Sequence, residues 1–169
     1  MDKMFFAKMR EGAIVPTKRK EDAGYDFYAC FDEDYFEIKN GETRPVPTGI
    51  AWACSPKYYM QIEERSGMGV KGIKKSAGVF DSGYRGEFLI AITNLTGKTL
   101  LISKLEEEEL STSYPQLDQK TCIIIPYAKA IVQGVVHEVP VLDVQEISYE
   151  DLLKMDSERK SGRFGSSGK

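Results

Sequence analysis

Residues 78–94 read GVFDSGYRGEFLIAITN and join two short apolar runs through a turn rich in small residues. β-Branched and aromatic residues dominate the two runs, and glycine and serine interrupt the pattern between them, which is typical of a β-hairpin. One carboxylate, Asp81, lies at the start of the turn. Aspartate is common in turns for purely structural reasons, so the segment predicts a hairpin and leaves a chemical role for Asp81 open.

Runs of the same kind recur along most of the chain and predict an all-β fold. Turn signals such as KNGE and PTG separate them, as in a sandwich, barrel or jelly roll. The expected strands cover residues 4–9, 25–30, 35–39, 49–54, 58–64, 78–80, 87–94, 99–104, 121–126, 130–139 and 141–147. Only residues 148–155 predict a short helix, because Ser148 and Asp151 have the spacing of an N-terminal cap.

The composition indicates one domain with an acidic balance. A chain of 169 residues suffices for one core plus tails, and 26 acidic against 23 basic residues give a formal charge of −3. This balance argues against general binding to nucleic acid or to an anionic membrane, so any phosphate has to be bound locally. No apolar run is long enough to span a bilayer or to form a signal-peptide core, and we expect a cytoplasmic protein.

Cysteine and histidine exclude several kinds of site. The three cysteines, Cys30, Cys54 and Cys122, show no CxxC spacing and are expected to be free thiols. The single histidine, His137, lies in a strand pattern and is interpreted as structural, which removes most Ser-His-Asp and multi-histidine metal schemes. Chemistry in this chain therefore depends on carboxylates, hydroxyls, arginine and backbone amides.

Two segments differ from the strand pattern. Residues 103–121 contain an acidic run and then a polar run, which we interpret as an insert that forms a solvated loop or a helical turn. Residues 156–169 are rich in glycine and serine and have too little apolar surface to hold themselves in place. We expect a β domain over residues 1–155 and a flexible C-terminal arm over residues 156–169.

The arm carries groups that suit a nucleotide. RKSGRFGSSG, residues 159–168, combines arginine, hydroxyls and glycine, all of which bind phosphate, with Phe164, which suits stacking on a base. Such a tail can order on binding and close over a ligand as a lid. The alternative is a plain flexible linker.

Three further segments suit a phosphate or metal site. EERSGMGVKG, residues 63–72, follows a strand and offers hydroxyl, arginine and glycine in the manner of an anion site, without the Walker A spacing. In DAGYDFYA, residues 22–29, Asp26 suits holding a water of hydrated Mg²⁺. Asp81 suits general-base catalysis toward a water. A tight turn, a surface acid and a structural turn aspartate are the respective alternatives.

Taken in order, five segments resemble the five motifs of the trimeric dUTPases, the dUTP diphosphatases. They are DAGYDFYA (22–29), RSGMGVKG (65–72), GVFDSGYRGEF (78–88), AKAIVQGVV (128–136) and RKSGRFGSSG (159–168). The resemblance implies a jelly-roll (β-clip) homotrimer with three active sites between subunits, each closed by an arm. It also implies Mg²⁺-dependent hydrolysis of dUTP to dUMP and diphosphate, which keeps uracil out of DNA and supplies dUMP for thymidylate synthesis.

The resemblance further implies roles for individual residues. Asp81 would activate the water that attacks the α-phosphorus, Tyr84 would pack on the deoxyribose and exclude a 2′-hydroxyl, and Asp26 would meet the hydration shell of Mg²⁺. Uracil would contact Ser76, Gly78, Val79 and Leu89. The phosphates would contact Arg65, Ser66, Gly67, Gln133, Arg159 and Ser166. Phe164, next to Gly165 in the substrate-binding part of the arm, would cover the uracil.

The chain departs from the family pattern at several positions. The segment from Arg65 to Asp81 is about one residue shorter, and Ser76 stands where glycine is frequent. Ala128 and Lys129 replace the usual Gly-Asp turn, and Arg163 replaces a glycine of the arm. The insert at residues 103–121 resembles the place where some phage-borne members carry an extra element, and a phage-borne protein would act in the host cytoplasm.

Two other functions stay open. The dCTP deaminases share the fold but use a catalytic glutamate on the strand after the hairpin, where this chain has Ala91. A regulatory interaction protein on the same scaffold would bind a protein partner through the insert. Its acids lie near apolar residues that suit such a surface, namely Leu105, Leu110, Tyr114 and Leu117.

Overall fold

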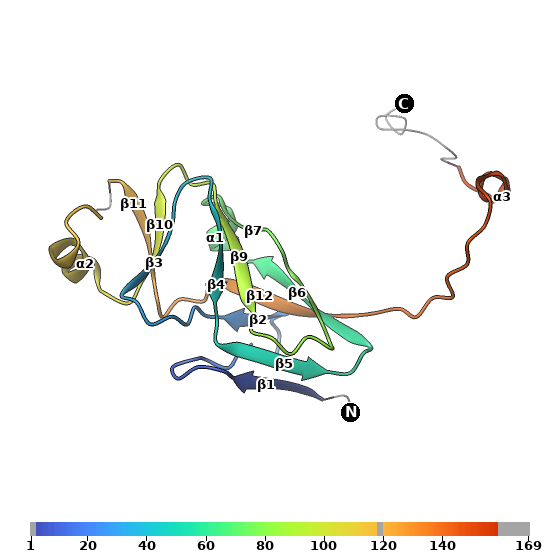
Figure 1. Cartoon of the computed structure of the whole chain (residues 1–169), viewed down its shortest axis with the longest axis horizontal. Helices are drawn as coiled ribbons and strands as arrows, with labels where there is room; N and C mark the ends of the chain where they lie inside the picture. Colours follow the sequence, from blue (N-terminus) through green and yellow to red (C-terminus); the bar gives the residue numbers. More distant parts are fainter. Residues whose placement is uncertain (1–2, 118–119, 159–169) are drawn as a thin grey trace. The chain divides into compact units, whose positions relative to one another are not determined.

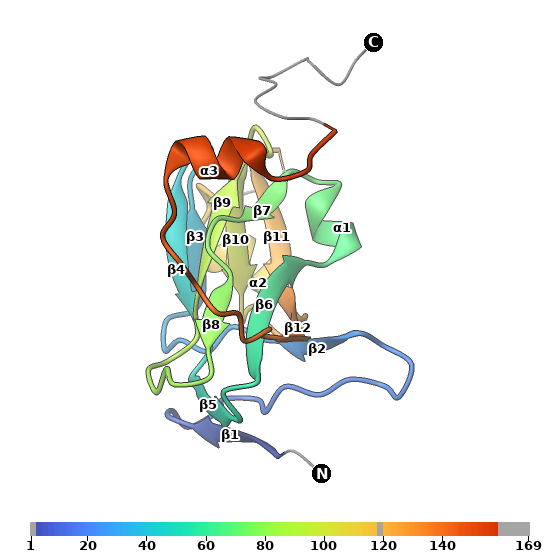
Figure 2. The ribbon, with the colours of Figure 1, turned by 90° about the vertical axis from the view of Figure 1, so that its right-hand side faces the viewer.

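The computed structural model describes residues 3–117 and 120–158 (Figure 1). The chain divides into two units at the junction of Val139 and Pro140, and each is described separately below. The first unit consists mainly of β-strands with short connections (Figure 2), which confirms the all-β prediction. None of the helices in the described ranges is long and apolar enough to cross a membrane.

The strands of the first unit form four small sheets. One sheet pairs β1 (Met4–Lys8) with β5 (Ile50–Cys54), and another has the order β11 (Cys122–Pro126), β10 (Thr99–Ser103), β3 (Tyr35–Ile38). Two further sheets matter most for function. The first has the order β2 (Gly24–Phe27), β12 (Val132–Glu138), β6 (Tyr58–Glu64), β8 (Val79–Asp81). The second has the order β4 (Thr43–Pro47), β9 (Leu89–Asn94), β7 (Ile73–Lys75).

The core forms because alternate residues of these strands are apolar. In β6, Met60 and Ile62 are fully buried, and in β9 the same holds for Ile90 and Ile92. Period-two alternation sends the intervening residues to the opposite face. Aromatic rings close the core beneath the segment from β8 to β9, with Phe80 stacked on Phe88 at a centroid distance of 4.1 Å.

Two strands were not predicted, and one predicted strand is wrong. β4 contains Pro45 and Pro47, and it forms because it lies at a sheet edge, where a missing N–H donor is tolerated. β7 has only three residues. Residues 141–147 alternate like a strand but lie in the second unit, and the described part of that unit contains no strand with which they could pair.

The structure contains three short helices where the sequence predicted one. α3 (Tyr149–Lys154) is confirmed with its cap, because the Ser148 hydroxyl accepts a hydrogen bond from the Asp151 backbone N–H at 3.1 Å. α1 (Ser66–Gly69) follows β6 directly. α2 (Glu107–Ser113) lies in the segment that we interpreted as an insert.

The segment around α2 has a small core of its own. Leu110 is fully buried and packs with Leu101, Leu117 and Cys122. The suggestion that Leu110 and Leu117 lie on an exposed interaction surface is therefore wrong, since Leu110 of α2 and Leu117 of the turn after it are both buried in this cluster. The Tyr114 hydroxyl donates to Asp34 Oδ2 at 2.8 Å and ties the end of α2 to the segment before β3.

The cysteines and the histidine occupy structural positions. Cys30 and Cys122 are buried, Cys54 is half-buried, and all three are free, as predicted. Burial raises the pKa of the Cys54 thiol. His137 lies in β12 with its ring stacked on Tyr59 at 5.4 Å. These contacts concern packing and include none of the predicted catalytic groups.

Candidate functional site

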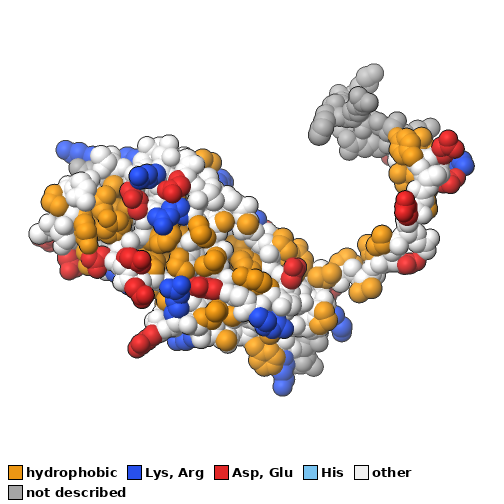
Figure 3. Space-filling view, viewed as in Figure 1, with side chains coloured by type: hydrophobic (Ala, Val, Ile, Leu, Met, Phe, Trp, Pro, Cys, Tyr) orange, Lys and Arg blue, Asp and Glu red, His pale blue; other side chains and the backbone are white. Residues whose placement is uncertain are grey.

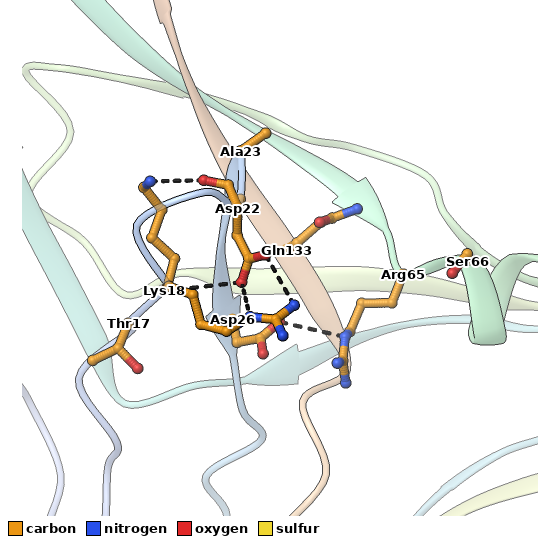
Figure 4. Close-up of a pocket in the computed structure, with 10 residues that line it drawn as sticks. Thr17, Lys18, Asp22, Ala23, Asp26, Arg65, Ser66 and Gln133 are labelled. Carbon is orange, nitrogen blue, oxygen red and sulfur yellow. Dashed lines mark hydrogen bonds and ion pairs between the residues drawn. The ribbon is translucent and has the colours of Figure 1, made fainter.

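A polar pocket of about 670 Å³ lies beside β2, β12 and the end of β6 (Figure 4). The pairing of β12 with β2 sets Gln133 opposite Asp26, and the chain leaves β6 through Arg65 and Ser66 into α1. Asp26, Arg65, Ser66 and Gln133, which come from three of the five motifs, all line this pocket. The structure therefore brings together most of the predicted phosphate and metal ligands of the β domain.

Arg65 is the main cation at the base of the pocket. Its Nε lies 3.3 Å from Asp26 Oδ1, and its terminal nitrogen donates to the Ala130 carbonyl at 3.0 Å. The side chains of Arg65 and Asp26 are 35% and 37% exposed, so solvent and ligands reach the pair. A phosphate that enters here competes with Asp26 for the guanidinium of Arg65. The carboxylate and the phosphate both carry charged oxygens that accept hydrogen bonds from the guanidinium N–H groups.

Gln133 is held against a glycine. Its side-chain Nε2 donates to the Glu64 carbonyl at 3.0 Å. A Cβ placed on Gly24 would lie 2.8 Å from Gln133 Oε1, so the glycine of the DAGYDF stretch makes room for the glutamine side chain. Gly67 is different, since a Cβ there would meet nothing within 4 Å, and it does not line the pocket.

Sequence reasoning missed a loop that lines the same pocket. Thr17, Lys18, Arg19 and Asp22 all face it. The Arg19 guanidinium donates to both oxygens of Asp22, at 2.8 and 3.0 Å. These bonds hold the pKa of the Asp22 carboxyl below its ordinary value and raise the pKa of Arg19. The available signal was the basic run at residues 18–20, directly before the first motif.

Asp26 suits a contact with hydrated Mg²⁺, whereas Asp22, the other carboxylate of this motif, accepts hydrogen bonds from Arg19. No group of three or more histidine, cysteine, aspartate or glutamate side chains in the described ranges could hold a metal ion. Mg²⁺ commonly retains several waters and binds through one or two carboxylates together with substrate phosphates. An Asp26 side chain beside a phosphate-type pocket suits that mode better than a closed protein cage.

The second group of predicted residues lies on the segment from β8 to β9. The β-hairpin predicted here is wrong, because β8 pairs with β6 whereas β9 pairs with β4 and β7 in another sheet. Asp81 is the last residue of β8 and is exposed. Its carbonyl accepts from the Tyr84 N–H at 3.0 Å and from the Trp52 indole N–H at 3.2 Å. Arg85 donates to the Ser82 carbonyl at 2.6 Å. The turn is thus fixed by hydrogen bonds on both sides of Asp81, and the carboxylate itself faces solvent.

Tyr84 lies flat over a glycine. Its hydroxyl donates to the Glu87 carbonyl at 3.2 Å, and a Cβ on Gly86 would lie only 2.4 Å from the hydroxyl oxygen. The ring stays 42% exposed. Val79 and Leu89 are also exposed, at 63% and 45%, so the segment from β8 to β9 presents apolar surface on both sides of the turn that follows Asp81.

Hydrogen bonds connect the segment before β8 to β6 and β9. The Ile62 N–H donates to the Gly78 carbonyl at 2.7 Å, and a Cβ on Gly78 would lie 2.8 Å from the Ile62 carbonyl oxygen. The Ser76 N–H donates to the Ala91 carbonyl at 2.8 Å, and the Ser76 and Thr93 hydroxyls are hydrogen-bonded to each other. Ala91 provides no carboxylate for deamination.

Within one chain, the residues of the polar pocket lie apart from the turn that carries Asp81. Asp81 pairs with Tyr59 at one end of β6, whereas Arg65 follows the other end. Six residues of strand separate these positions, which corresponds to about 20 Å. Arg159, Phe164, Gly165 and Ser166 lie outside the described residues.

Curated relatives cover the chain to different extents. The dUTPase family model matches residues 10–106. A deoxyuridine 5′-triphosphate nucleotidohydrolase of Nautilia profundicola is 31% identical over 171 residues, which cover 99% of each chain. One of Leptospira interrogans is 36% identical over 104 residues, 59% of this chain and 71% of its own length.

Solved structures share the fold. The dUTPase of Staphylococcus bacteriophage 80alpha, in complex with dUPNHPP, has a TM-score of 0.74 at 21% identity, with 99% of each chain covered. The native EIAV dUTPase has a TM-score of 0.62 at 17% identity and covers 87% of this chain and 98% of its own. Together with the family match and the jelly-roll arrangement of the strands, these similarities show that the chain belongs to the dUTPase family.

Proposed function

We propose that this protein hydrolyses dUTP to dUMP and diphosphate, with Asp81 as the general base. The observation that carries the proposal is the fixed turn that exposes the Asp81 carboxylate while its carbonyl is held by Tyr84 and Trp52. A base of this kind needs a fixed backbone position and access to water, and the hydrogen-bonded turn with its exposed carboxylate supports both. Membership of the dUTPase family supplies the substrate.

The reaction is a displacement at the α-phosphorus. The Asp81 carboxylate accepts a proton from a water whose oxygen forms a bond to that phosphorus. The bond from the α-phosphorus to the oxygen that bridges it to the β-phosphorus breaks, and diphosphate leaves with that oxygen. Positioning and charge neutralisation contribute most of the rate in such reactions, so the surrounding groups matter as much as the base.

The segment from β8 to β9 supplies recognition of the nucleoside. Tyr84 packs on the deoxyribose and excludes a 2′-hydroxyl; in support, its hydroxyl is held by the Glu87 carbonyl next to Gly86. Val79, Leu89, Gly78 and Ser76 contact the uracil. In support, the two larger side chains are exposed, and Gly78 has no room for a side chain.

The polar pocket supplies the phosphate contacts. Arg65, Ser66, Gly67 and Gln133 bind the phosphate chain, and Asp26 holds Mg²⁺ through water. When bound, Mg²⁺ neutralises phosphate charge. Asp26 would give up its ion pair with Arg65 to hold the hydrated ion, which would leave the guanidinium to the phosphate. From the arm at residues 156–169, Arg159 and Ser166 contact the terminal phosphates, Phe164 covers the uracil, and Gly165 belongs to the same substrate-binding part.

The active form is a homotrimer whose sites lie between subunits. Two observations support this. Asp81 and Arg65 lie at opposite ends of β6, so a complete site needs groups from more than one copy. In addition, residues 141–147 include Val141, Leu142 and Val144 and pair with no strand in the described part of the second unit. Hydrophobic side chains follow the extended segment that leads to α3 (Figure 3), and such a segment suits a surface on another copy.

The test is a diphosphate-release assay with Mg²⁺ across the nucleoside triphosphates. We expect rapid turnover of dUTP and little of UTP or dTTP, and almost none of dUTP by Asp81→Asn. An Asp81→Asn variant at the wild-type rate would remove the base assignment. For the trimer, Asp81→Asn and Arg65→Ala chains are unfolded together and refolded as a mixture. Recovery of activity that neither variant has alone supports shared sites, and no recovery contradicts them.

A further inference from the structure

The loop at residues 17–22, here called the basic loop, is built by its own hydrogen bonds. The Asp26 N–H donates to the Thr17 carbonyl at 2.9 Å and ties the start of the loop to β2. Within the loop, Lys18 Nζ donates to the Asp22 carbonyl at 2.7 Å, and the Asp22 N–H donates to the Arg19 carbonyl at 3.2 Å. The loop therefore has a defined course beside the pocket.

The basic loop changes the charge of the pocket. Its lining contains three cations, Lys18, Arg19 and Arg65, against two carboxylates, Asp22 and Asp26. Figure 4 shows Lys18 and Arg65 on opposite sides of the two carboxylates. A triphosphate carries more negative charge than Arg65 alone neutralises, so further cations at this opening favour its binding.

Arg19 and Arg65 are each paired with an aspartate of the first-motif region. Arg19 donates to both carboxylate oxygens of Asp22, whereas Arg65 forms an ion pair with Asp26 through Nε. The Arg19 side chain is 88% exposed, and an ion pair so open to water is weakly held. If the Arg19 side chain turns away, the Asp22 carboxylate still accepts a hydrogen bond from the Arg19 backbone N–H, whose nitrogen lies 3.3 Å from Asp22 Oδ2.

We propose that Arg19 is a second phosphate-binding arginine, which exchanges Asp22 for the phosphate chain of the substrate. The inference rests on the proposed function, because it requires a nucleotide whose phosphates occupy this pocket. A guanidinium that is already directed at two carboxylate oxygens presents the same fork to two phosphate oxygens. Lys18 contributes charge, since its amine is engaged by the Asp22 carbonyl.

The test compares Arg19→Ala with Lys20→Ala in the assembled protein. Lys20 is the next residue and carries the same charge, but its side chain does not line this pocket. Binding of deoxyuridine, dUMP and a non-hydrolysable dUTP analogue is measured by calorimetry. We expect Arg19→Ala to weaken binding of the analogue roughly tenfold or more, as for a charge-assisted hydrogen bond, and to leave deoxyuridine unchanged. Lys20→Ala should match the wild type for all three.

Two results would overturn the inference. One is an Arg19→Ala variant that binds the analogue as tightly as Lys20→Ala does. The other is an equal loss of affinity for deoxyuridine and for the analogue, which would make the basic loop a structural support only. Arg65→Ala is measured in parallel. Unchanged analogue binding in that variant would count against the phosphate site of the proposed function itself, so the two failures are separate.

Discussion

The indole N–H of Trp52 donates to the main-chain carbonyl of Asp81 over 3.2 Å. Trp52 lies in β5 and is only 2% exposed, and its ring packs edge-on against Phe88 at 5.8 Å. Arg85 adds a second connection, because it donates to the Trp52 carbonyl at 3.4 Å. A strand remote in sequence thus fixes the backbone that carries the proposed base.

Replacement of Trp52 by phenylalanine keeps an aromatic ring and removes this donor. We expect kcat to fall about tenfold with little change in KM, because small displacements of a catalytic group are costly. The loss of one hydrogen bond should also lower the free energy of unfolding by about 1 kcal/mol. Steady-state kinetics and chemical denaturation measure the two effects.

The matched control is Phe31→Leu. Phe31 is a buried aromatic residue that packs on Phe36 and Tyr127 rather than on the segment from β8 to β9. This variant should lose stability and keep its kcat. Equal kcat values for Trp52→Phe and the wild type would show that the indole serves packing alone.

Gly86 should determine discrimination between deoxyribose and ribose. A Cβ at this position would lie 2.4 Å from the Tyr84 hydroxyl oxygen, so Gly86→Ala displaces the ring. We expect the ratio of kcat/KM for dUTP to that for UTP to fall at least several-fold. Gly83→Ala is the control, because a Cβ at Gly83 meets nothing within 4 Å. A ratio that Gly86→Ala leaves intact would contradict the role of Tyr84.

The segment around α2 should be separable from catalysis. Leu110 is fully buried in a cluster that contains none of the proposed site residues. Leu110→Ala should cost about 2 to 5 kcal/mol of local stability, which hydrogen exchange in α2 would detect, while turnover of dUTP stays unchanged. The exposed substitution Glu108→Ala serves as control. A parallel loss of turnover in Leu110→Ala would mean that the segment supports the active site.

The contact between α2 and β3 should weaken in alkali. The hydrogen bond that Tyr114 donates to Asp34 raises the pKa of the Tyr114 hydroxyl above its ordinary value. The contact requires the protonated hydroxyl, so its contribution is complete below the ordinary pKa of about 10 and is lost as the pH rises through the raised value. Exchange rates in α2 should increase over that range. Tyr114→Phe should lack this dependence, and an identical profile for both proteins would exclude Tyr114 as its source.

Local patterns predicted the parts of the fold that depend on local sequence. The cap at Ser148 follows from neighbouring residues and is present. The two strands and the turn around Asp81 are also present, but they do not form the predicted hairpin, because each strand pairs with a partner in a different sheet. The strand expected at residues 141–147 failed because a strand also needs a partner, which alternation does not supply. β4 was missed for the opposite reason, since its prolines oppose strand formation anywhere except at an edge.

The candidate site was predictable by its residues more than by its geometry. Asp26, Arg65 and Gln133 were identified by resemblance and meet in one pocket. Arg19 was missed because a basic run gives no indication of the surface that it faces. The distance between Arg65 and Asp81 depends on the register of β6 with β8, which the sequence does not display.

The length of β6 also has a consequence for how activity depends on protein concentration. Because each chain holds the phosphate ligands at one end of this strand and Asp81 at the other, turnover under the proposed assembly is a property of neighbouring copies. On dilution below the dissociation constant of the assembly, specific activity would decline although every chain stays folded, an effect easily mistaken for slow inactivation. A chain with a damaged Asp81 would still lend its intact pocket to a neighbour, so its defect would be partly recessive in a mixed population.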